Sequence, residues 1–212
     1  MLSHRGYRPT VLLTGFGPFP GVTQNVSGEL VEALAQRARD VLRDHNVVSQ
    51  VLPTEWARVP ELAAALHAEH RPVLALHFGV AREATGFRLE TTAVNLCRAS
   101  LDANEALPAA ECLIEDGIAF RKASIDVAAI AEALRAGGYP VSISDDAGSY
   151  LCNALLYHSL TAAAANQPRR CRVGFVHIPA DLSQPPFALQ YAVSGALEIL
   201  NAALEREPLT PS

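Results

Sequence analysis

Short hydrophobic runs alternate along this chain with longer stretches in which apolar residues return every three or four positions. The short runs predict buried strands, and the longer stretches predict amphipathic helices. The expected strands are Val11–Thr14, Val47–Leu52, Val73–Phe78, Pro140–Ile143 and Arg172–His177. The expected helices are Gly28–Arg43, Glu55–Glu69, Ile125–Ala136, Gly148–Ala165 and Pro186–Glu205.

This alternation is typical of an α/β fold built on a largely parallel sheet. We expect a three-layer α/β/α sandwich around a mostly parallel mixed sheet. A single domain should cover residues 1–212, with frayed ends at 1–9 and 208–212. From about Ala84 to Phe120 the periodicity is unclear, so strands and loops outside the simple alternation are expected there.

Composition narrows the function classes. Half of the 212 residues are hydrophobic, 18% are charged and the formal net charge is −5, which suits a globular protein and argues against nucleic-acid binding. The N-terminus lacks the apolar core of a signal peptide, and no apolar run reaches the roughly 18 residues that a membrane span needs. A cytoplasmic location without membrane association is therefore the expectation.

The four cysteines, Cys97, Cys112, Cys152 and Cys171, form no Cys-x-x-Cys pair and have no histidine spacing that resembles a zinc site. We expect neither a metal nor a cofactor. In a reducing compartment each thiol stays free, either as a small buried apolar residue or as a reactive group.

The segment Thr14–Gly21 follows a strand, precedes a helix and superficially imitates the glycine fingerprint of a dinucleotide site. Pro20 occupies the third glycine position, however, and Pro18 and Pro20 lack the N–H groups that a phosphate cradle would use. A stiff loop that presents Phe16 and Phe19 at the carboxyl edge of the sheet is the better interpretation. The alternative is that both rings pack inward.

Cys152 falls in the first turn of an expected helix, at the end of the segment Ser144–Asn153. The dipole and free N–H groups at a helix start favour a thiolate, which is the nucleophilic form of cysteine. Asp145 or Asp146 is expected to cap this helix. Taken alone, a cysteine in this position is more often a buried helix residue than a nucleophile.

His177 ends the strand that follows this helix. In a strand–helix–strand crossover the helix start and the end of the next strand lie at the same edge of the sheet, so Cys152 and His177 should meet. A nearby imidazole can take the thiol proton and later protonate a leaving amine. Glu90 is the candidate that orients the imidazole, but spacing does not distinguish it from Glu83, Asp145 or Asp146.

These segments resemble the pyroglutamyl peptidase I family of cysteine peptidases, from about Thr10 to Pro179. The likeness rests on four motifs, which are Val11–Gly21 followed by Asn25 and Ser27, Leu89-Glu90 followed by Asn95, Asp146–Asn153, and Phe175–Pro179. The resemblance implies hydrolysis of the amide bond after an N-terminal pyroglutamyl residue through a thioester. It implies Cys152, His177 and Glu90 as catalytic residues, and it implies a homotetramer.

The resemblance also implies that Phe16, Phe19 and Asn25 belong to the substrate site, with peptides that carry N-terminal pyroglutamate as partners. This chain has Arg82-Glu83-Ala84 where many bacterial members have Gly-Gly-Arg, and around Glu90 it is more similar to animal-type members. Two alternatives stay open: a thiol hydrolase of the same fold with another amide or ester substrate, and a non-catalytic protein that keeps the pocket.

Overall fold

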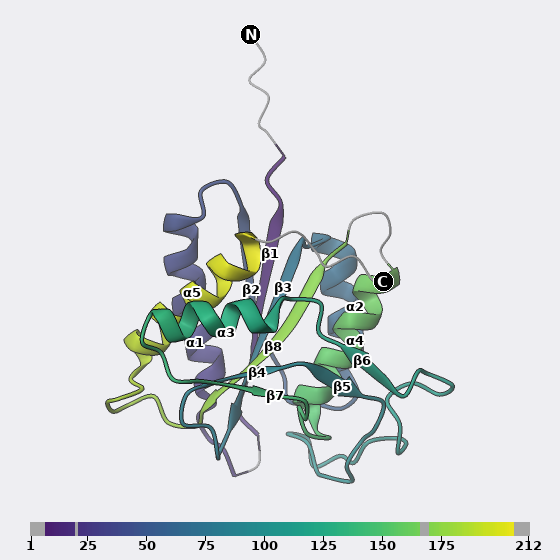
Figure 1. The fold of residues 1–212 in the computed structure, drawn as a ribbon. Coiled ribbons are helices and arrows are strands. Elements are labelled where there is room, and N and C mark those ends of the chain that lie inside the picture. The colour runs from purple at the N-terminus through teal and green to yellow at the C-terminus, as the bar shows by residue number, and fades with distance from the viewer. Residues whose placement is uncertain (1–6, 20, 166–169, 206–212) are drawn as a thin grey trace.

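A six-stranded sheet forms the centre of the computed structural model, which describes residues 7–19, 21–165 and 170–205 (Figure 1). In spatial order its strands are β2 (Asn46–Leu52), β1 (Thr10–Phe16), β3 (Leu74–Ala81), β8 (Arg172–Pro179), β4 (Phe87–Glu90) and β7 (Val141–Ser144). The first four run parallel, whereas β4 and β7 run in the opposite direction. The sheet is therefore mixed and mostly parallel, as predicted.

Helices cover both faces of the sheet, which gives the three layers seen in Figure 1. One face packs against α1 (Val26–Val41), α3 (Val127–Ala136) and α5 (Leu189–Glu205), and the other against α2 (Arg58–His70) and α4 (Leu151–Ala165). Because successive side chains of a strand point to opposite faces, β1 contributes to both cores. Val11 and Leu13 pack with the first group of helices, and Leu12 and Phe16 pack with the second.

All five expected helices and all five expected strands are present, within a few residues of their predicted bounds. The segment of unclear periodicity holds β4 and β5 (Thr92–Val94), which pairs with β6 (Phe120–Lys122) in a separate two-stranded sheet. Residues 95–119 between these two strands are called the arm below. Within the described residues, no helix has the length and apolar character needed to cross a bilayer.

Two sequence expectations fall on residues that the structure does not describe. Residues 1–6 and 208–212 lie outside the described ranges, and so does Pro20. Of the expected N-terminal frayed segment, residues 7–9 are described, and they have no regular secondary structure.

The direction of β7 corrects the expected crossover. β7 pairs parallel with β4, and β4 pairs antiparallel with β8, so β7 runs opposite to β8. Hydrophobic periodicity carries no information on strand direction. Here β4 lies between β7 and β8 and pairs antiparallel with β8, so β7 cannot run parallel to β8. Cys152 and His177 are instead brought to one edge by α4 and β8 alone, because α4 precedes β8 in the chain and packs along it.

The sheet opens between β1 and β3 near their carboxyl ends. The two strands pair from Val11–Leu74 as far as Thr14–His77, and beyond that pair Phe16 and Gly79 belong to separated strand ends. The strand order also reverses at this point, because the chain passes from β1 outward to β2 and then back to β3. Open α/β sheets place their ligands in such a crevice.

Candidate active site

Cys152 occupies the first turn of α4, directly above β3. A β-carbon at Gly79 would lie 2.8 Å from the Cys152 sulfur, so the two backbones approach closely here. The thiol is half-buried, at the start of the helix where unpaired backbone N–H groups favour negative charge. The sulfur is therefore positioned at the carboxyl edge of the sheet, beside the opening between β1 and β3.

His177 and Glu90 form a buried hydrogen-bonded pair next to this sulfur. His177 Nδ1 donates to Glu90 Oε1 over 2.7 Å, and the two residues are 6% and 0% exposed. The antiparallel register of β4 and β8 produces this contact, because it sets Arg88 opposite His177 and Glu90 opposite Phe175. Cys152 is near enough for its charge to raise the pKa of His177, so the three groups lie together.

The charges around His177 favour the protonated form of its imidazole. Burial by itself lowers the pKa of His177, but the neighbouring Cys152 thiolate, the Glu90 carboxylate and the hydrogen bonds to both raise it to about 9. The imidazole is therefore protonated at neutral pH when Cys152 is a thiolate. This arrangement can supply a nucleophile and a proton donor at the same time.

Of the four carboxylates that the sequence left open, Glu90 is the one that contacts His177. Glu83, Asp145 and Asp146 are exposed, whereas Glu90 is fully buried against His177. Asp146 Oδ1 accepts the backbone N–H of Gly148 over 2.8 Å, in the loop before α4. Because α4 begins only at Leu151, the expectation that Asp145 or Asp146 caps this helix is wrong.

Three aromatic rings form a cluster around Tyr150, just before the start of α4. The ring of Phe19 lies 6.2 Å from that of Tyr150, and Trp56 packs edge-on against Tyr150 at 5.2 Å. The Tyr150 hydroxyl donates to the carbonyl of Leu101 over 3.0 Å. Burial, with the negative charges of Asp102 and Cys152, raises the pKa of Tyr150 to about 12, so this hydroxyl stays neutral.

Phe16 and Phe19 differ in exposure. Phe16, at the end of β1, is 2% exposed and packs in the core cluster that contains Leu52 and Trp56. Phe19 is half-buried and lies in a tight turn, where it forms paired backbone hydrogen bonds with Val22. Of the two phenylalanines, Phe19 is thus the one with accessible surface beside Tyr150.

Asn25 holds the loop after β1 through both ends of its amide. Its Nδ2 donates to the Gly17 carbonyl over 3.0 Å. Its Oδ1 accepts the N–H and the hydroxyl of Ser27, so Asn25 caps the start of α1. The Gly17 N–H donates to Leu52, and the Phe16 N–H donates to Ser27. These N–H groups are committed within the protein, which argues against a phosphate cradle.

Three residues near Cys152 and His177 were not predicted from the sequence, namely Gly79, Tyr150 and Phe175. Phe175 lies under the site, with its ring centroid 4.9 Å from that of His177 and its Cζ 2.8 Å from a β-carbon at Gly79. A glycine inside a strand signals close backbone approach, so the sequence did contain a hint for Gly79. Tyr150 and Phe175 carried no such signal, because aromatic residues near a helix start or in a strand usually pack in the core.

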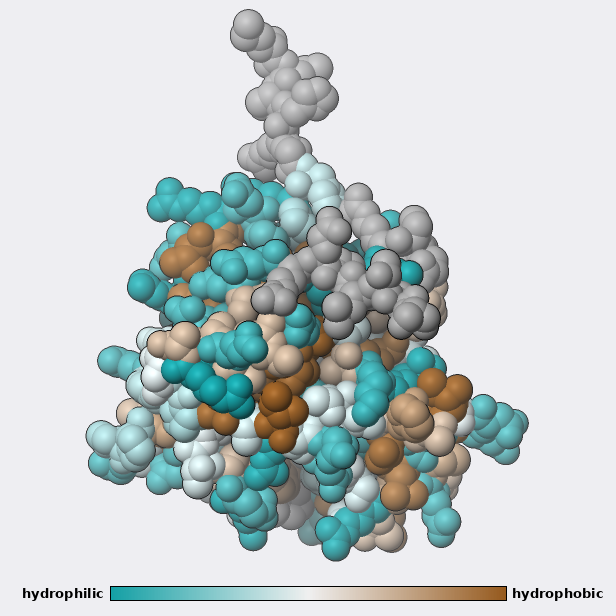
Figure 2. Space-filling model, viewed as in Figure 1, coloured by the Kyte–Doolittle hydropathy of each residue, from teal (hydrophilic) through white to brown (hydrophobic). Residues whose placement is uncertain are grey.

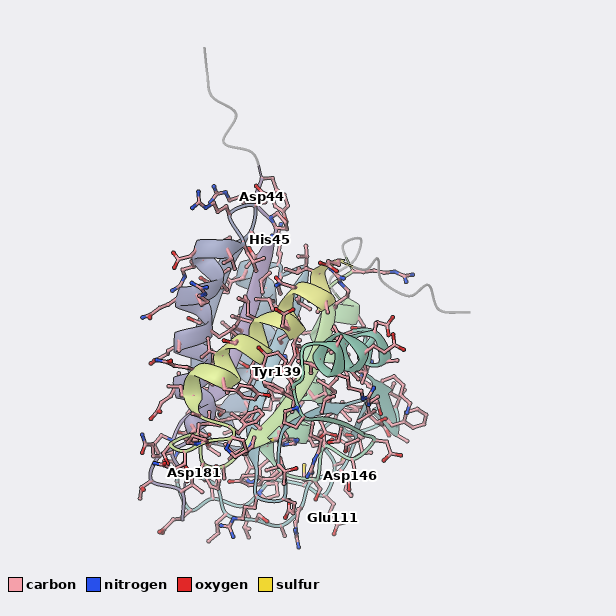
Figure 3. All side chains as sticks on the ribbon, turned by 60° about the vertical axis from the view of Figure 1, so that its left-hand side comes forward. Asp44, His45, Glu111, Tyr139, Asp146 and Asp181 are labelled. Carbon is pink, nitrogen blue, oxygen red and sulfur yellow. The ribbon has the colours of Figure 1, made fainter. Side chains whose placement is uncertain are left out.

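The loops that flank Cys152 and His177 lie at the same end of the molecule. Figure 3 shows Asp146, in the loop before α4, and Asp181, in the loop after β8, at one end of the molecule, whereas Asp44 and His45 lie at the other.

A separate cavity of about 570 Å³ lies between the start of α2, α4 and the arm. Its lining includes Ala154 and His158, on the side of α4 turned away from Cys152, so it is distinct from the candidate site.

The chain is similar in sequence and structure to known pyroglutamyl peptidases. A family model described as pyroglutamyl peptidase matches residues 9–195. Pyrrolidone-carboxylate peptidase of Bacillus cytotoxicus is 32% identical over 93% of this chain and 94% of its own, and pyroglutamyl-peptidase 1 of Mus musculus is 36% identical over 81% and 79%. The crystal structure of pyroglutamyl peptidase I from Bacillus amyloliquefaciens superposes with a TM-score of 0.82, at 27% identity over 93% and 95% of the two chains.

Proposed function

The chain belongs to the pyroglutamyl peptidase family, and on this premise we propose that it removes N-terminal pyroglutamyl residues from peptides with Cys152 as the nucleophile. The observation that carries the proposal is the placement of Cys152 against Gly79, the register partner of His177, beside the hydrogen-bonded pair of His177 and Glu90. A thiol, an imidazole and an orienting carboxylate in this order are the groups that cysteine-dependent acyl transfer requires.

The proposed reaction has two steps. The Cys152 thiolate attacks the pyroglutamyl carbonyl carbon, protonated His177 gives its proton to the departing amine, and the C–N bond breaks to leave a thioester. His177 then takes a proton from water, the resulting hydroxide attacks the thioester, and the thiolate is released with free pyroglutamate. Glu90 keeps the Nδ1 proton of His177 in place, so that the opposite nitrogen faces the reacting atoms.

The lactam ring is proposed to bind in the opening between β1 and β3, with Phe19 and Phe16 as apolar walls. Backbone groups at the two strand ends would read the lactam N–H and carbonyl, because this edge of the sheet is where pairing stops. Asn25 is assigned to the same site because it donates to the Gly17 carbonyl and so fixes the loop that carries Phe19. N–H groups at the start of α4 would stabilise the oxyanion.

Two rivals make different predictions. A thiol hydrolase with another substrate would prefer a different N-terminally blocked amide or an ester over the pyroglutamyl amide. A non-catalytic protein would have a Cys152 no more sensitive to alkylation than Cys97, Cys112 or Cys171. The family match supports the peptidase over both, and the pairing of His177 with Glu90 beside Cys152 argues against a non-catalytic protein.

The test is hydrolysis of the pyroglutamyl amide of a fluorogenic amine, with a panel of other blocked amides for comparison. We expect turnover by the wild type, and loss of it in Cys152→Ala with an unchanged melting temperature. Cys171→Ala is the matched control, because burial raises the pKa of this thiol to about 12 and makes it unreactive. Activity in Cys152→Ala equal to that of the wild type would refute the proposal.

We also propose that the chain forms a homo-oligomer, with the homotetramer of the resembled family as the expected state. Large hydrophobic side chains are exposed on the arm and on β6, and Figure 2 shows hydrophobic residues at the surface over β6. They are Leu96, Leu101, Leu107, Ile118 and Phe120. Sedimentation should give a mass above that of the 22.6 kDa chain, and Phe120→Glu should lower it.

A cytoplasmic location is proposed as well. Its support is that all four cysteines are free thiols, which suits a reducing compartment. Fractionation of the source cells, with activity assayed in each fraction, tests it.

A further inference from the structure

One face of α4 meets one face of β3 at two points. Cys152 and Ser159 are seven residues apart, which is close to two helical turns, so both lie on the same side of the helix. His77 and Gly79 are two residues apart on β3 and point to the same side of the sheet. Cys152 lies against Gly79, and Ser159 Oγ lies 2.7 Å from His77 Nε2.

The second contact belongs to a buried hydrogen-bond network that joins four elements. Thr14 Oγ1 on β1 is 2.7 Å from His77 Nδ1, and Ser159 Oγ is 2.8 Å from Nε2 of His67 on α2. None of the four side chains is more than 1% exposed. A buried network whose members are all partnered fixes the relative placement of the elements that carry them.

The protonation states are constrained. Ser159 has one hydroxyl proton and contacts two Nε2 atoms, so one of the histidines must donate to it. Two neutral imidazoles satisfy every bond if each group donates to the next one along the network, for example His67 to Ser159, Ser159 to His77 and His77 to Thr14. Burial lowers the pKa of His67 to about 4, and burial together with the charge of His67 lowers that of His77 to about 3. Both rings are therefore neutral at pH 7.

The network lies next to the proposed substrate site. Thr14 and His77 are the last residues paired between β1 and β3, immediately before the strands separate. His177, in turn, is the residue of β8 that pairs with Gly79. Because α4 is a continuous helix, a shift at Ser159 relative to β3 would carry Cys152 away from both Gly79 and His177.

We propose that Ser159 and His77 are positioning residues whose hydrogen bond sets the register of α4 on β3, and thereby holds the Cys152 sulfur over Gly79 beside His177. The proposal rests on the peptidase function proposed above. It distinguishes these residues from ordinary core residues, whose loss lowers stability but leaves the folded enzyme fully active.

The test is Ser159→Ala, compared with Thr161→Ala on the same helix, whose hydroxyl donates to the Tyr157 carbonyl one turn earlier. For Ser159→Ala we expect kcat to fall by about tenfold or more with KM within about threefold, since misplacement of a reacting group mainly slows the chemical step. Alkylation of Cys152 by iodoacetamide, followed by mass spectrometry, should slow in parallel because the thiolate loses its imidazolium partner. Thr161→Ala should leave all three unchanged.

A lower melting temperature with wild-type kcat in Ser159→Ala would overturn the proposal. If wild type itself fails to turn over the reporter, the proposed function is wrong, and the alkylation rate still tests the positioning.

Thr14→Val provides a second, nearly isosteric variant that should fold even if Ser159→Ala does not. It removes the hydroxyl that orients the His77 ring while leaving α4 untouched, and kcat should again fall with KM retained. In the Ser159→Ala background the same change should have no further effect on kcat, because the two residues act through one network. Additive losses in the double variant, or unchanged kcat in Thr14→Val, would contradict a shared positioning role.

Discussion

The sulfur of Cys152 lies against the backbone of Gly79, at a position where any β-carbon would come within 2.8 Å of it. Gly79 is also the register partner of His177, so the strand that supports the thiol is bonded to the strand that carries the imidazole. The β-carbon would equally lie 2.8 Å from Cζ of the buried Phe175 ring. The absence of a side chain at one residue of β3 therefore makes the contact between helix and sheet possible.

Gly79→Ala should impair catalysis more than stability. The added methyl group must displace either the Phe175 ring, which is fully buried, or the start of α4, and the second movement takes Cys152 away from His177. We expect kcat to fall by roughly 10²-fold, as for other small displacements of a reacting group. Steady-state kinetics and a thermal melt of the same sample check this. Wild-type kcat in a folded variant would mean that the helix tolerates the methyl group.

Glu90→Gln should slow turnover strongly while substrate binding persists. A neutral amide does not stabilise the imidazolium and can hold the wrong tautomer of His177. By analogy with catalytic triads, kcat should fall by roughly 10²- to 10⁴-fold. The matched control is Glu83→Gln, which changes an exposed carboxylate in the loop after β3. An equal effect of both substitutions would remove the orienting role from Glu90.

Activity should decline as the pH rises through about 9. Protonated His177 gives its proton to the leaving amine, and burial together with the opposing influence of Cys152 and Glu90 sets its pKa at about 9. Glu90→Gln removes the carboxylate charge and weakens the hydrogen bond, both of which raise this pKa, so the fall of kcat/KM on the alkaline side should move to lower pH. Profiles of the wild type and the variant measured over the alkaline range test the shift, and coincident limbs would count against it.

Folding stability should fall as the medium becomes acidic. In the unfolded chain His67 and His77 take up protons near pH 6.5, but in the folded protein their pKa values are about 4 and about 3. The unfolded state therefore binds more protons below pH 6.5, and stability is lost progressively from there towards pH 4. His67 alone accounts for a loss on the order of 3 kcal/mol.

Urea unfolding between pH 7.5 and 4 measures this loss. His67→Gln should be less stable at pH 7.5 but should show a weaker dependence on pH. His45→Gln is the control, because His45 lies at the end of the molecule remote from the site (Figure 3). Parallel pH profiles for wild type and His67→Gln would show that His67 does not contribute to acid unfolding.

Much of the candidate site followed from the sequence because its two reactive residues have local signals. Cys152 stands at the start of an amphipathic stretch and His177 at the end of a hydrophobic run, and one helix connects to one strand between them. Glu90 was different, since it contacts His177 across 87 positions of sequence. Only the pairing of β4 with β8 distinguishes it from the exposed carboxylates.

The amino-acid sequence by itself determined the order and type of the elements, the α/β class and the residues at the ends of α4 and β8, because periodicity and helix-start chemistry are properties of neighbouring positions. The tertiary structure decided the direction of β7, the choice of Glu90, the need for glycine at Gly79 and the network through Ser159. These depend on which strands pair and in which register, and such contacts join positions that no local pattern relates.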